Sequence, residues 1–288
     1  MEEFSIHPET HVGSVHLTVP DLERSLRFYL KTLGFDLLER EQGRALLGAG
    51  KTPLVGLTEQ PDARPRQRST TGLYHLAILL PSRRELARTL HHLIEMGSPP
   101  EGAADHLVSE ALYLSDPDAN GIEISADRPR REWPRHDGQV QMATNPLDLQ
   151  QLLSEADTSP WKGLPPRTRI GHVHLQVSDL RRAEAFYHQI LGFDLTQRYG
   201  PSAVFLSAGG YHHHVGLNTW AGVGALQPPA DAAGLRYFTL CLPNWAELER
   251  IAERLTAAGV APEQREDGLF LRDPSGNGVL LTPQCGKI

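Results

Sequence analysis

The stretch IGHVHLQVSDLRRAEAFYHQILGF, residues 170–193, predicts a β-strand, a turn and an α-helix in that order. Each of three further stretches resembles it: HVGSVHLTVPDLERSLRFYLKTLGF (11–35), GLYHLAILLPSRRELARTLHHLIEMG (72–97) and GLRYFTLCLPNWAELERIAERLTAAG (234–259). Every copy begins with a short strand rich in Val, Leu and Ile, and continues with apolar residues at helical spacing. This self-similarity indicates an internal repeat of one structural unit.

Glycines mark the end of each predicted helix. Gly34, Gly97, Gly192 and Gly259 occupy the position where a helix C-terminus favours a left-handed residue. Further short strands follow each helix, such as RALLGAG and TPLVGLTE in the first unit. The repeating unit is therefore βαβββ, and it occurs four times.

A segment rich in Pro, Arg, Asp and Trp separates the second unit from the third. It contains one amphipathic stretch, PLDLQQLLSEA (146–156), which predicts a short helix in a linker over residues 131–165. The predicted domains are residues 1–130, with modules 1 and 2, and residues 166–288, with modules 3 and 4.

Composition indicates a globular chain that binds small molecules. Its 288 residues are 40% hydrophobic, and no apolar run is long enough to span a bilayer, so we expect no membrane partner. A net charge of −7, with one short basic run (RPRR, 128–131), argues against nucleic acid as a partner. The N-terminal MEEFSIHPETHVG has neither a basic leader nor a hydrophobic segment, so we expect a cytoplasmic protein. Composition leaves a homo-oligomer open.

The two cysteines carry little information in the sequence. Cys241 and Cys285 give neither a disulfide framework nor a zinc-binding spacing. We expect two free thiols.

Potential metal ligands occur at one position of the repeat. When the four copies are aligned at the strand-to-turn junction, Ser14, His75, His172 and Tyr237 fall in register. Only His75 and His172 offer an imidazole. The last strand of the second unit carries Glu123, whose counterpart in the fourth unit is Leu280.

A fourfold βαβββ repeat resembles the vicinal oxygen chelate superfamily, which contains glyoxalase I, antibiotic resistance proteins and extradiol ring-cleaving dioxygenases. The resemblance covers nearly the whole chain apart from the linker and the ends. It implies an α+β fold in which two modules close into a cup around one metal, each cup being an open mixed β-sheet with helices outside. It identifies the scaffold, whereas function depends on the site.

The set of His75, His172 and Glu123 suits a metal. Two imidazoles and one carboxylate form the facial arrangement that binds non-haem Fe(II), and Mn(II) is an alternative with the same ligands. Taken singly, each histidine is better explained as a core residue bonded to a backbone carbonyl. Their shared register, together with the carboxylate, favours ligands.

The resemblance also raises a question of which modules share the metal cup. Extradiol dioxygenases commonly pair modules 3 and 4, but here module 4 offers only Tyr237 and Leu280. We expect modules 2 and 3 to form one cup and modules 1 and 4 the other, because this pairing places every reactive residue in one cavity. The alternative pairs modules 1 and 2, with Ser14 or His16 as the third ligand. His16 and His174 are equivalent to each other and lie two residues after the aligned positions.

The stretch ADHLVSEALYLSDPDANGIEI, residues 104–124, predicts two strands joined by a tight turn. It resembles the dioxygenase signature, which implies that His106 and Tyr113 contact substrate and that Glu123 binds the metal. The signature normally has Gly or Pro where Ala119 stands. Asn120 and Gly121 are expected to supply the turn instead.

The segment YHHHVGLNTW, residues 211–220, resembles the strand that carries the catalytic acid–base histidine of the same enzymes. His213 is the best match, and His212 and His214 remain open. If all three lie on a strand, His213 faces one side while the other two face the opposite side. His214, His174 and Tyr237 are further candidates for the site.

These residues together favour an Fe(II)-dependent extradiol dioxygenase of the catechol 2,3-dioxygenase type. Such an enzyme cleaves catechol or a substituted catechol with O₂, next to the two hydroxyl groups, to a 2-hydroxymuconic semialdehyde. One alternative is a glyoxalase-like, metal-dependent lyase or isomerase, although those usually have more than one carboxylate ligand. Another is a non-catalytic protein that binds an aromatic drug.

Overall fold

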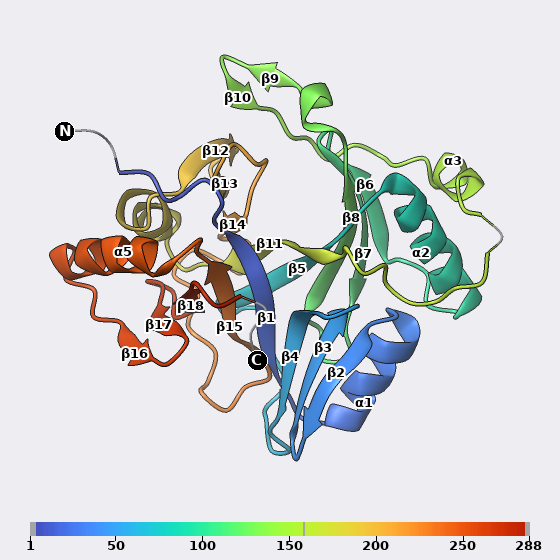
Figure 1. The fold of residues 1–288 in the computed structure, drawn as a ribbon, viewed down its shortest axis with the longest axis horizontal. Helices are drawn as coiled ribbons and strands as arrows, with labels where there is room; N and C mark the ends of the chain where they lie inside the picture. The colour runs from blue at the N-terminus through green and yellow to red at the C-terminus, as the bar shows by residue number, and fades with distance from the viewer. Residues whose placement is uncertain (1–3, 158, 286–288) are drawn as a thin grey trace.

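Four βαβββ modules make up the chain in the computed structural model, which describes residues 4–157 and 159–285 (Figure 1). The predicted α+β fold of four repeated modules is confirmed. Among the described residues, no helix has the length and apolar character needed to cross a membrane.

The first two modules follow the predicted order of elements. Module 1 contains β1 (His11–Val19), α1 (Leu22–Arg27) with its continuation η1 (Phe28–Thr32), β2 (Asp36–Glu41), β3 (Arg44–Ala49) and β4 (Thr52–Glu59). Module 2 contains β5 (Gly72–Leu80), α2 (Arg83–Glu95), β6 (Gly102–Asp105), β7 (Ser109–Ser115) and β8 (Gly121–Asp127).

The last two modules repeat this order. Module 3 contains β11 (Arg169–Gln176), α4 (Leu180–Glu184) with its continuation η3 (Ala185–Ile190), β12 (Asp194–Tyr199), β13 (Ala203–Ser207) and β14 (Val215–Asn218). Module 4 contains β15 (Gly234–Cys241), α5 (Trp245–Ala257), β16 (Glu263–Arg265), β17 (Gly268–Arg272) and β18 (Gly278–Thr282).

The linker between modules 2 and 3 holds more structure than the short helix that the sequence predicts. That helix is α3 (Leu149–Ser154), and it is preceded by η2 (Arg130–Glu132) and by a small hairpin of β9 (Arg135–His136) and β10 (Gln139–Val140).

Modules pair across the chain to form two eight-stranded sheets. One sheet has the order β16-β17-β18-β15-β1-β4-β3-β2, from modules 4 and 1, and the other has the order β12-β13-β14-β11-β5-β8-β7-β6, from modules 3 and 2. Antiparallel pairs join the modules at each centre, β1 with β15 and β5 with β11. The expected exchange of modules is confirmed, and each sheet takes one module from each half of the sequence. The domain boundaries proposed from the sequence stay a prediction.

Local sequence fixes where the helices begin and end. Asp21, Ser82, Asp179 and Asn244 cap the four module helices, each by accepting a backbone N–H three residues later. The four glycines expected after the helices all have positive φ, from 68° to 87°. The repeat is therefore encoded by matching start and stop signals.

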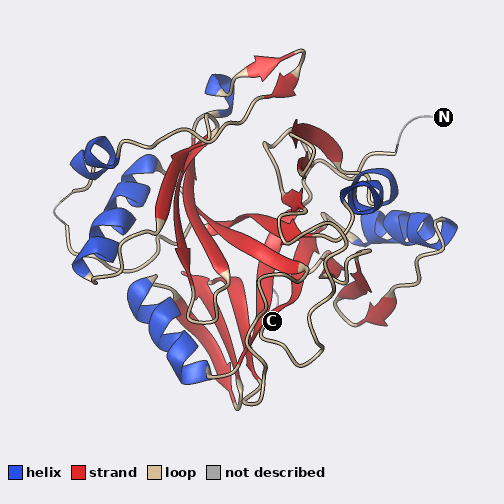
Figure 2. Ribbon diagram, turned by 180° about the vertical axis from the view of Figure 1, so that it is seen from behind, coloured by secondary structure: helices blue, strands red, loops and turns tan. Residues whose placement is uncertain are grey.

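The helices lie outside the curved sheets and cover them (Figure 2). Helix α2 shows why: Leu86, Leu90 and Leu93 are completely or almost completely buried and recur at helical spacing. Burying a leucine side chain contributes about 1.5–3 kcal/mol. This apolar stripe fixes α2 against its sheet and leaves the other face of the sheet for the cup.

The turn between β7 and β8 differs from its prediction in one detail. Ala119 has φ +62°, whereas the equivalent Gly276 of module 4 has φ +87°. The left-handed residue of the turn is thus Ala119 itself rather than Asn120 or Gly121. Asp116 holds the turn because its carboxylate accepts the backbone N–H groups of Asp118 and Asn120 at 2.9 and 2.8 Å.

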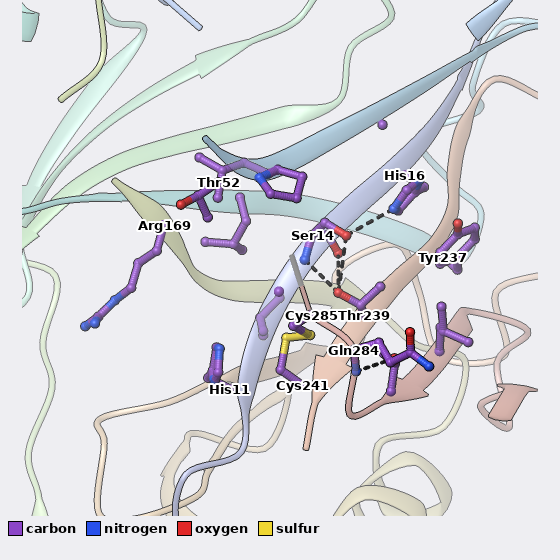
Figure 3. Close-up of a pocket in the computed structure, with 18 of the residues that line it drawn as sticks. His11, Ser14, His16, Thr52, Arg169, Tyr237, Thr239, Cys241, Gln284 and Cys285 are labelled. Carbon is purple, nitrogen blue, oxygen red and sulfur yellow. Dashed lines mark hydrogen bonds between the residues drawn. A yellow bond between two sulfur atoms is a disulfide. The ribbon is translucent and has the colours of Figure 1, made fainter. Parts of the chain in front are cut away.

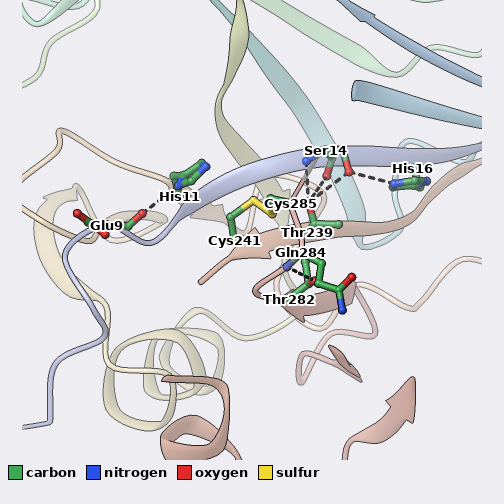
Figure 4. The surroundings of a disulfide bond; sticks show 9 residues. All are labelled: Glu9, His11, Ser14, His16, Thr239, Cys241, Thr282, Gln284 and Cys285. Carbon is green, nitrogen blue, oxygen red and sulfur yellow. Dashed lines mark hydrogen bonds between the residues drawn. A yellow bond between two sulfur atoms is a disulfide. The ribbon is translucent and has the colours of Figure 1, made fainter. Parts of the chain in front are cut away.

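The expectation of two free thiols was wrong, because Cys241 and Cys285 form a disulfide (Figure 4). They are 44 residues apart in the chain, a separation from which the sequence alone does not predict a disulfide. Parallel pairing of β15 with β18 places Cys241 beside Thr282, and the chain after β18 returns Cys285 to it. Their Cα atoms lie 5.6 Å apart, as a disulfide requires. The cytoplasmic location stays a prediction.

Candidate metal centre

Three buried donors converge at the centre of the sheet from modules 2 and 3. His75 Nε2 lies 3.1 Å from His172 Nε2 and 3.2 Å from Glu123 Oε2, and the distance from His172 Nε2 to Glu123 Oε2 is 3.5 Å. Three donors on one face of an octahedral ion, each about 2.1 Å from it, are about 3.0 Å apart. The predicted ligand set therefore has the spacing that one metal ion needs. We call the concave face around these residues the metal cup.

Strand register explains this convergence. His172 on β11 pairs with Ala77 on β5, and Ala77 pairs with Glu123 on β8, so the three form one row across the sheet. His75 precedes Ala77 by two residues and faces the same side. Ala77 has the smallest side chain that still carries Cβ, which leaves room between the two outer members of the row.

The protonation states of His75 and Glu123 also suit a bound cation. Burial lowers the pKa of His75 to about 3, although Glu123 opposes this, so the imidazole is neutral near pH 7 and has a lone pair to offer. Burial alone would raise the pKa of Glu123, but the His172 and His75 imidazoles outweigh it and lower that pKa. Glu123 is thus a buried carboxylate, and no Lys or Arg within the described residues forms an ion pair with it. A divalent ion would supply the missing positive charge.

Tyr113 and His106 flank the metal ligands as a bonded pair. Tyr113 lies opposite Glu123 in the β7–β8 pair, and its hydroxyl contacts His106 Nε2. His106 Nδ1 lies 2.6 Å from the carbonyl of Ala143, so this nitrogen carries the proton and donates, while Nε2 accepts from Tyr113. Burial raises the pKa of Tyr113, and so does Glu123, which keeps the phenol protonated.

The segment that holds His212, His213 and His214 is not a strand, because β14 begins only at Val215. The expected alternation of faces was therefore wrong. The His213 ring packs against the His172 ring, with centroids 3.9 Å apart and planes tilted by 40°, and faces the metal cup. His212 contacts His213 directly, with their Nδ1 atoms 2.9 Å apart.

Asp127, which the sequence analysis did not identify, fixes His212. Its two carboxylate oxygens lie 3.0 Å from His212 Nε2 and 3.0 Å from the Tyr211 hydroxyl. The result is a chain of contacts from Asp127 through His212 to His213. Asp127 is the last residue of β8, four positions after Glu123, and nothing in its sequence context indicated this contact.

Three further candidates differ in where they lie. His174 is next to His75, at 5.0 Å between ring centroids, and its buried Nε2 has no hydrogen-bond partner among the described residues. His214 lies away from the metal cup and accepts the Ala208 N–H through Nδ1 at 3.1 Å. Tyr237 belongs to β15, in the other sheet, where it stacks on His16. The structure thus brings His174 to the ligands but neither His214 nor Tyr237.

Comparison with known proteins agrees with the fold. The family model described as Glyoxalase/Bleomycin resistance protein/Dioxygenase superfamily matches residues 11–124 and 169–281. The chain belongs to this superfamily. The matched ranges contain nearly all of the four modules and leave out the whole linker, residues 131–165.

Individual members of the Glyoxalase/Bleomycin resistance protein/Dioxygenase superfamily are similar over nearly the whole chain. The catechol-2,3-dioxygenase of Bacillus subtilis is 51% identical over 282 residues, which are 96% of this chain and 98% of that protein. Among solved structures, glyoxalase I from Zea mays has a TM-score of 0.59 at 17% identity, covering 95% of this chain and 92% of that chain. A Bacillus subtilis protein assigned provisionally as a dioxygenase has a TM-score of 0.65 at 13% identity, covering 99% and 87%. The two solved structures support the fold alone.

Proposed function

We propose that the protein is an Fe(II)-dependent extradiol dioxygenase that cleaves catechol, or a substituted catechol, with O₂. Both oxygen atoms enter the product, so that catechol plus O₂ gives 2-hydroxymuconic semialdehyde. The observation that carries the proposal is the buried group of His75, His172 and Glu123, with His213 and Tyr113 beside it. The 51% identity to a catechol-2,3-dioxygenase supports the same reaction.

His75, His172 and Glu123 would hold the iron. The ion, when bound, supplies Lewis acidity and redox chemistry beside the catechol oxygens. Two neutral imidazoles and one carboxylate leave one positive charge on a divalent ion, which attracts a catechol that has lost a proton. The same three ligands would accept Mn(II), so the choice of iron belongs to the proposal.

His213 is the residue we assign to proton transfer. It is buried, and burial, as the main cause, lowers its pKa, so its imidazole is neutral and can accept the proton of a catechol hydroxyl. The same nitrogen can return that proton later in the reaction. His212 is held by Asp127 and contacts His213 through Nδ1, which leaves His213 Nε2 as the atom free to face substrate. Among the three neighbouring histidines, His213 alone combines a position over His172 with an orienting partner.

Tyr113 and His106 would bind the substrate on the opposite side. The phenol of Tyr113 stays protonated and gives its one proton to His106 Nε2, so its oxygen can accept a hydrogen bond from a substrate hydroxyl next to Glu123. His106 is fixed by the Ala143 carbonyl and accepts from Tyr113, so it orients that hydroxyl. The two residues thus position substrate.

Oxygen consumption by the iron-loaded protein tests this proposal. Full-length protein is reconstituted with Fe(II) without air and assayed in an oxygen electrode with catechol, protocatechuate and hydroquinone in turn. We expect uptake and a yellow product with catechol, and no uptake with hydroquinone, whose hydroxyls are not adjacent. Metal binding without oxygen uptake on any of the three would favour a lyase or isomerase. Binding of aromatic compounds with no metal requirement would favour a drug-binding protein.

A further inference from the structure

The sheet from modules 1 and 4 contains a cavity of about 1010 Å³ on its concave side (Figure 3). We call this concave face the second cup. Its lining includes Ser14 and His16 from β1 and Tyr237 and Thr239 from β15, together with Leu280 from β18. Ligand pockets for small organic molecules have volumes of about 300–1,000 Å³. The second cup is therefore large enough for such a molecule.

The second cup has lost its metal ligands. The row of His172, Ala77 and Glu123 in the metal cup corresponds to Ser14, Thr239 and Leu280 here, and Thr239 pairs with Leu280 as Ala77 pairs with Glu123. A hydroxyl replaces the imidazole at Ser14, and no polar group replaces the carboxylate at Leu280. The Thr239 hydroxyl accepts the Ser14 N–H at 2.7 Å and lies 3.2 Å from the Ser14 hydroxyl. These groups can hydrogen-bond an organic ligand but form a poor metal site.

A flat pair of rings lines one end of the second cup. His16 and Tyr237 stack with centroids 4.2 Å apart and an angle of 13° between their planes (Figure 3). His16 Nε2 lies 3.0 Å from the Ser14 hydroxyl. Burial, assisted by the charge of Arg236, lowers the pKa of His16 to about 4, so the ring is neutral near pH 7. The stacked pair offers a planar surface against which an aromatic ring can pack.

Three arginines lie near this ring pair. Arg265, Arg236 and Arg44 each oppose the rise in the Tyr237 pKa that burial and the Asp267 carboxylate cause. Arg265 is paired with Glu263, and the cavity lining also includes Glu39 and Glu41. Neither Arg44 nor Arg236 forms an ion pair or a side-chain hydrogen bond with any described residue, although both line the cavity. Arg236 occupies the position before Tyr237 that the aromatic Tyr74 occupies before His75 in the metal cup. The two cups therefore differ in charge at equivalent places.

We propose that the second cup is a metal-independent binding site for a small aromatic carboxylate. The carboxylate would pair with the guanidinium groups of Arg236 and Arg44, which are available for a bidentate contact. Its ring would pack against His16 and Tyr237, and the Ser14 and Thr239 hydroxyls would bond any polar substituent. This inference does not rest on the proposed oxygenase reaction.

Calorimetric titration with benzoate tests the proposal. The full-length, iron-loaded protein is titrated under nitrogen, with and without saturating catechol, so that binding in the metal cup is separated from binding in the second cup. We expect one saturable benzoate site per chain that catechol does not abolish. Arg236→Gln and Arg44→Gln should each weaken benzoate binding at least tenfold.

Arg182→Gln is the matched control, because Arg182 is exposed at the start of α4 and does not line the cavity. It should leave the benzoate dissociation constant within about twofold of the native value, since it makes the same change of charge elsewhere. Thermal unfolding confirms that each variant is folded. The proposal is overturned if benzoate does not saturate, if catechol abolishes its binding, or if Arg236→Gln and Arg44→Gln bind it like Arg182→Gln.

Discussion

His75 Nε2 and His172 Nε2 lie 3.1 Å apart although 97 residues separate them in the chain. The contact exists because β5 of module 2 and β11 of module 3 are antiparallel neighbours at the centre of one sheet. Pairing of modules within each sequence half would have placed these imidazoles in different sheets. The exchange of modules is thus what assembles a complete ligand set from a chain whose fourth module has none.

His213 and His214 should respond differently to alanine substitution. His213→Ala should retain iron and lose turnover by about 10²–10⁴-fold, because a positioned acid–base group contributes that much. His214→Ala removes a side chain that lies outside the metal cup and should leave turnover within a few fold. Iron content and steady-state oxygen uptake measure both. Unchanged turnover in His213→Ala would move the proton-transfer role to another residue.

Asp127→Asn should slow catalysis without releasing iron. The substitution weakens the contact with His212 Nε2, which lies 3.0 Å from the carboxylate, and so loosens the orientation of His213. Loss of a partner that orients a catalytic or ligating side chain typically costs about 10–100-fold. We expect kcat to fall with KM for catechol nearly unchanged. A matching control is Tyr211→Phe, which keeps the Asp127–His212 contact, and equal losses in both variants would argue for a general structural effect.

The turn next to Glu123 should become more stable when Ala119 is replaced by glycine. Ala119 has φ +62°, a conformation that glycine adopts without strain. We expect Ala119→Gly to raise the free energy of unfolding by about 0.5–1 kcal/mol. The reciprocal change, Gly276→Ala at φ +87°, should lower it by about 1 kcal/mol or more, since its Cβ would also meet the Gln227 side chain at 2.5 Å. The free energy of unfolding of both variants is measured by urea unfolding. A lower free energy of unfolding in Ala119→Gly than in the native protein would contradict the strain assigned to Ala119.

Acid should destabilise the fold partly through His214. Burial, the main cause, lowers its pKa from the ordinary 6.5 to about 3 in the folded protein. The unfolded chain therefore binds the proton first, so the contribution of His214 is present above about pH 6.5 and is lost as the pH falls toward 3. Between about pH 7 and pH 4.5 the loss is on the order of 2 kcal/mol.

A His214→Gln variant isolates this contribution from the other buried histidines. Its free energy of unfolding should fall less steeply with acid than that of the native protein, measured by urea unfolding at several pH values. His91→Gln is a suitable control, because His91 is exposed on α2. Parallel pH curves for native protein and His214→Gln would contradict the role assigned to burial.

The sequence was sufficient for the features that repeat. Capping residues, terminal glycines and strand patterns recur in every module, and the shared register of His75 and His172 predicted their common place on the first strand. The single carboxylate Glu123 then favoured the pairing of modules 2 and 3. Repetition supplied several independent copies of each local signal, which made these predictions reliable.

Contacts between distant and irregular segments were not predictable in this way. The linker carbonyl of Ala143 fixes His106, and Asp127 fixes His212, but neither contact follows from periodicity or from a motif. The faces of His212 and His213 were misjudged because their segment precedes β14 and has no period of two. The disulfide of Cys241 depends on the path of the chain after β18.

Oxygen uptake by native protein and by Glu123→Ala, both prepared with Fe(II), tests the central claim most directly. Glu95→Ala, at an exposed position on α2, is the matched control for loss of a carboxylate. The account predicts that the native protein and Glu95→Ala bind one iron per chain and consume one O₂ per catechol. It predicts that Glu123→Ala binds iron more than about 100-fold more weakly and loses oxygen uptake. The affinity loss should exceed about 100-fold because even residues that only hydrogen-bond to a metal ligand contribute about 10–100-fold to metal affinity. Stoichiometric iron and native oxygen uptake in Glu123→Ala would contradict the assignment of the metal centre.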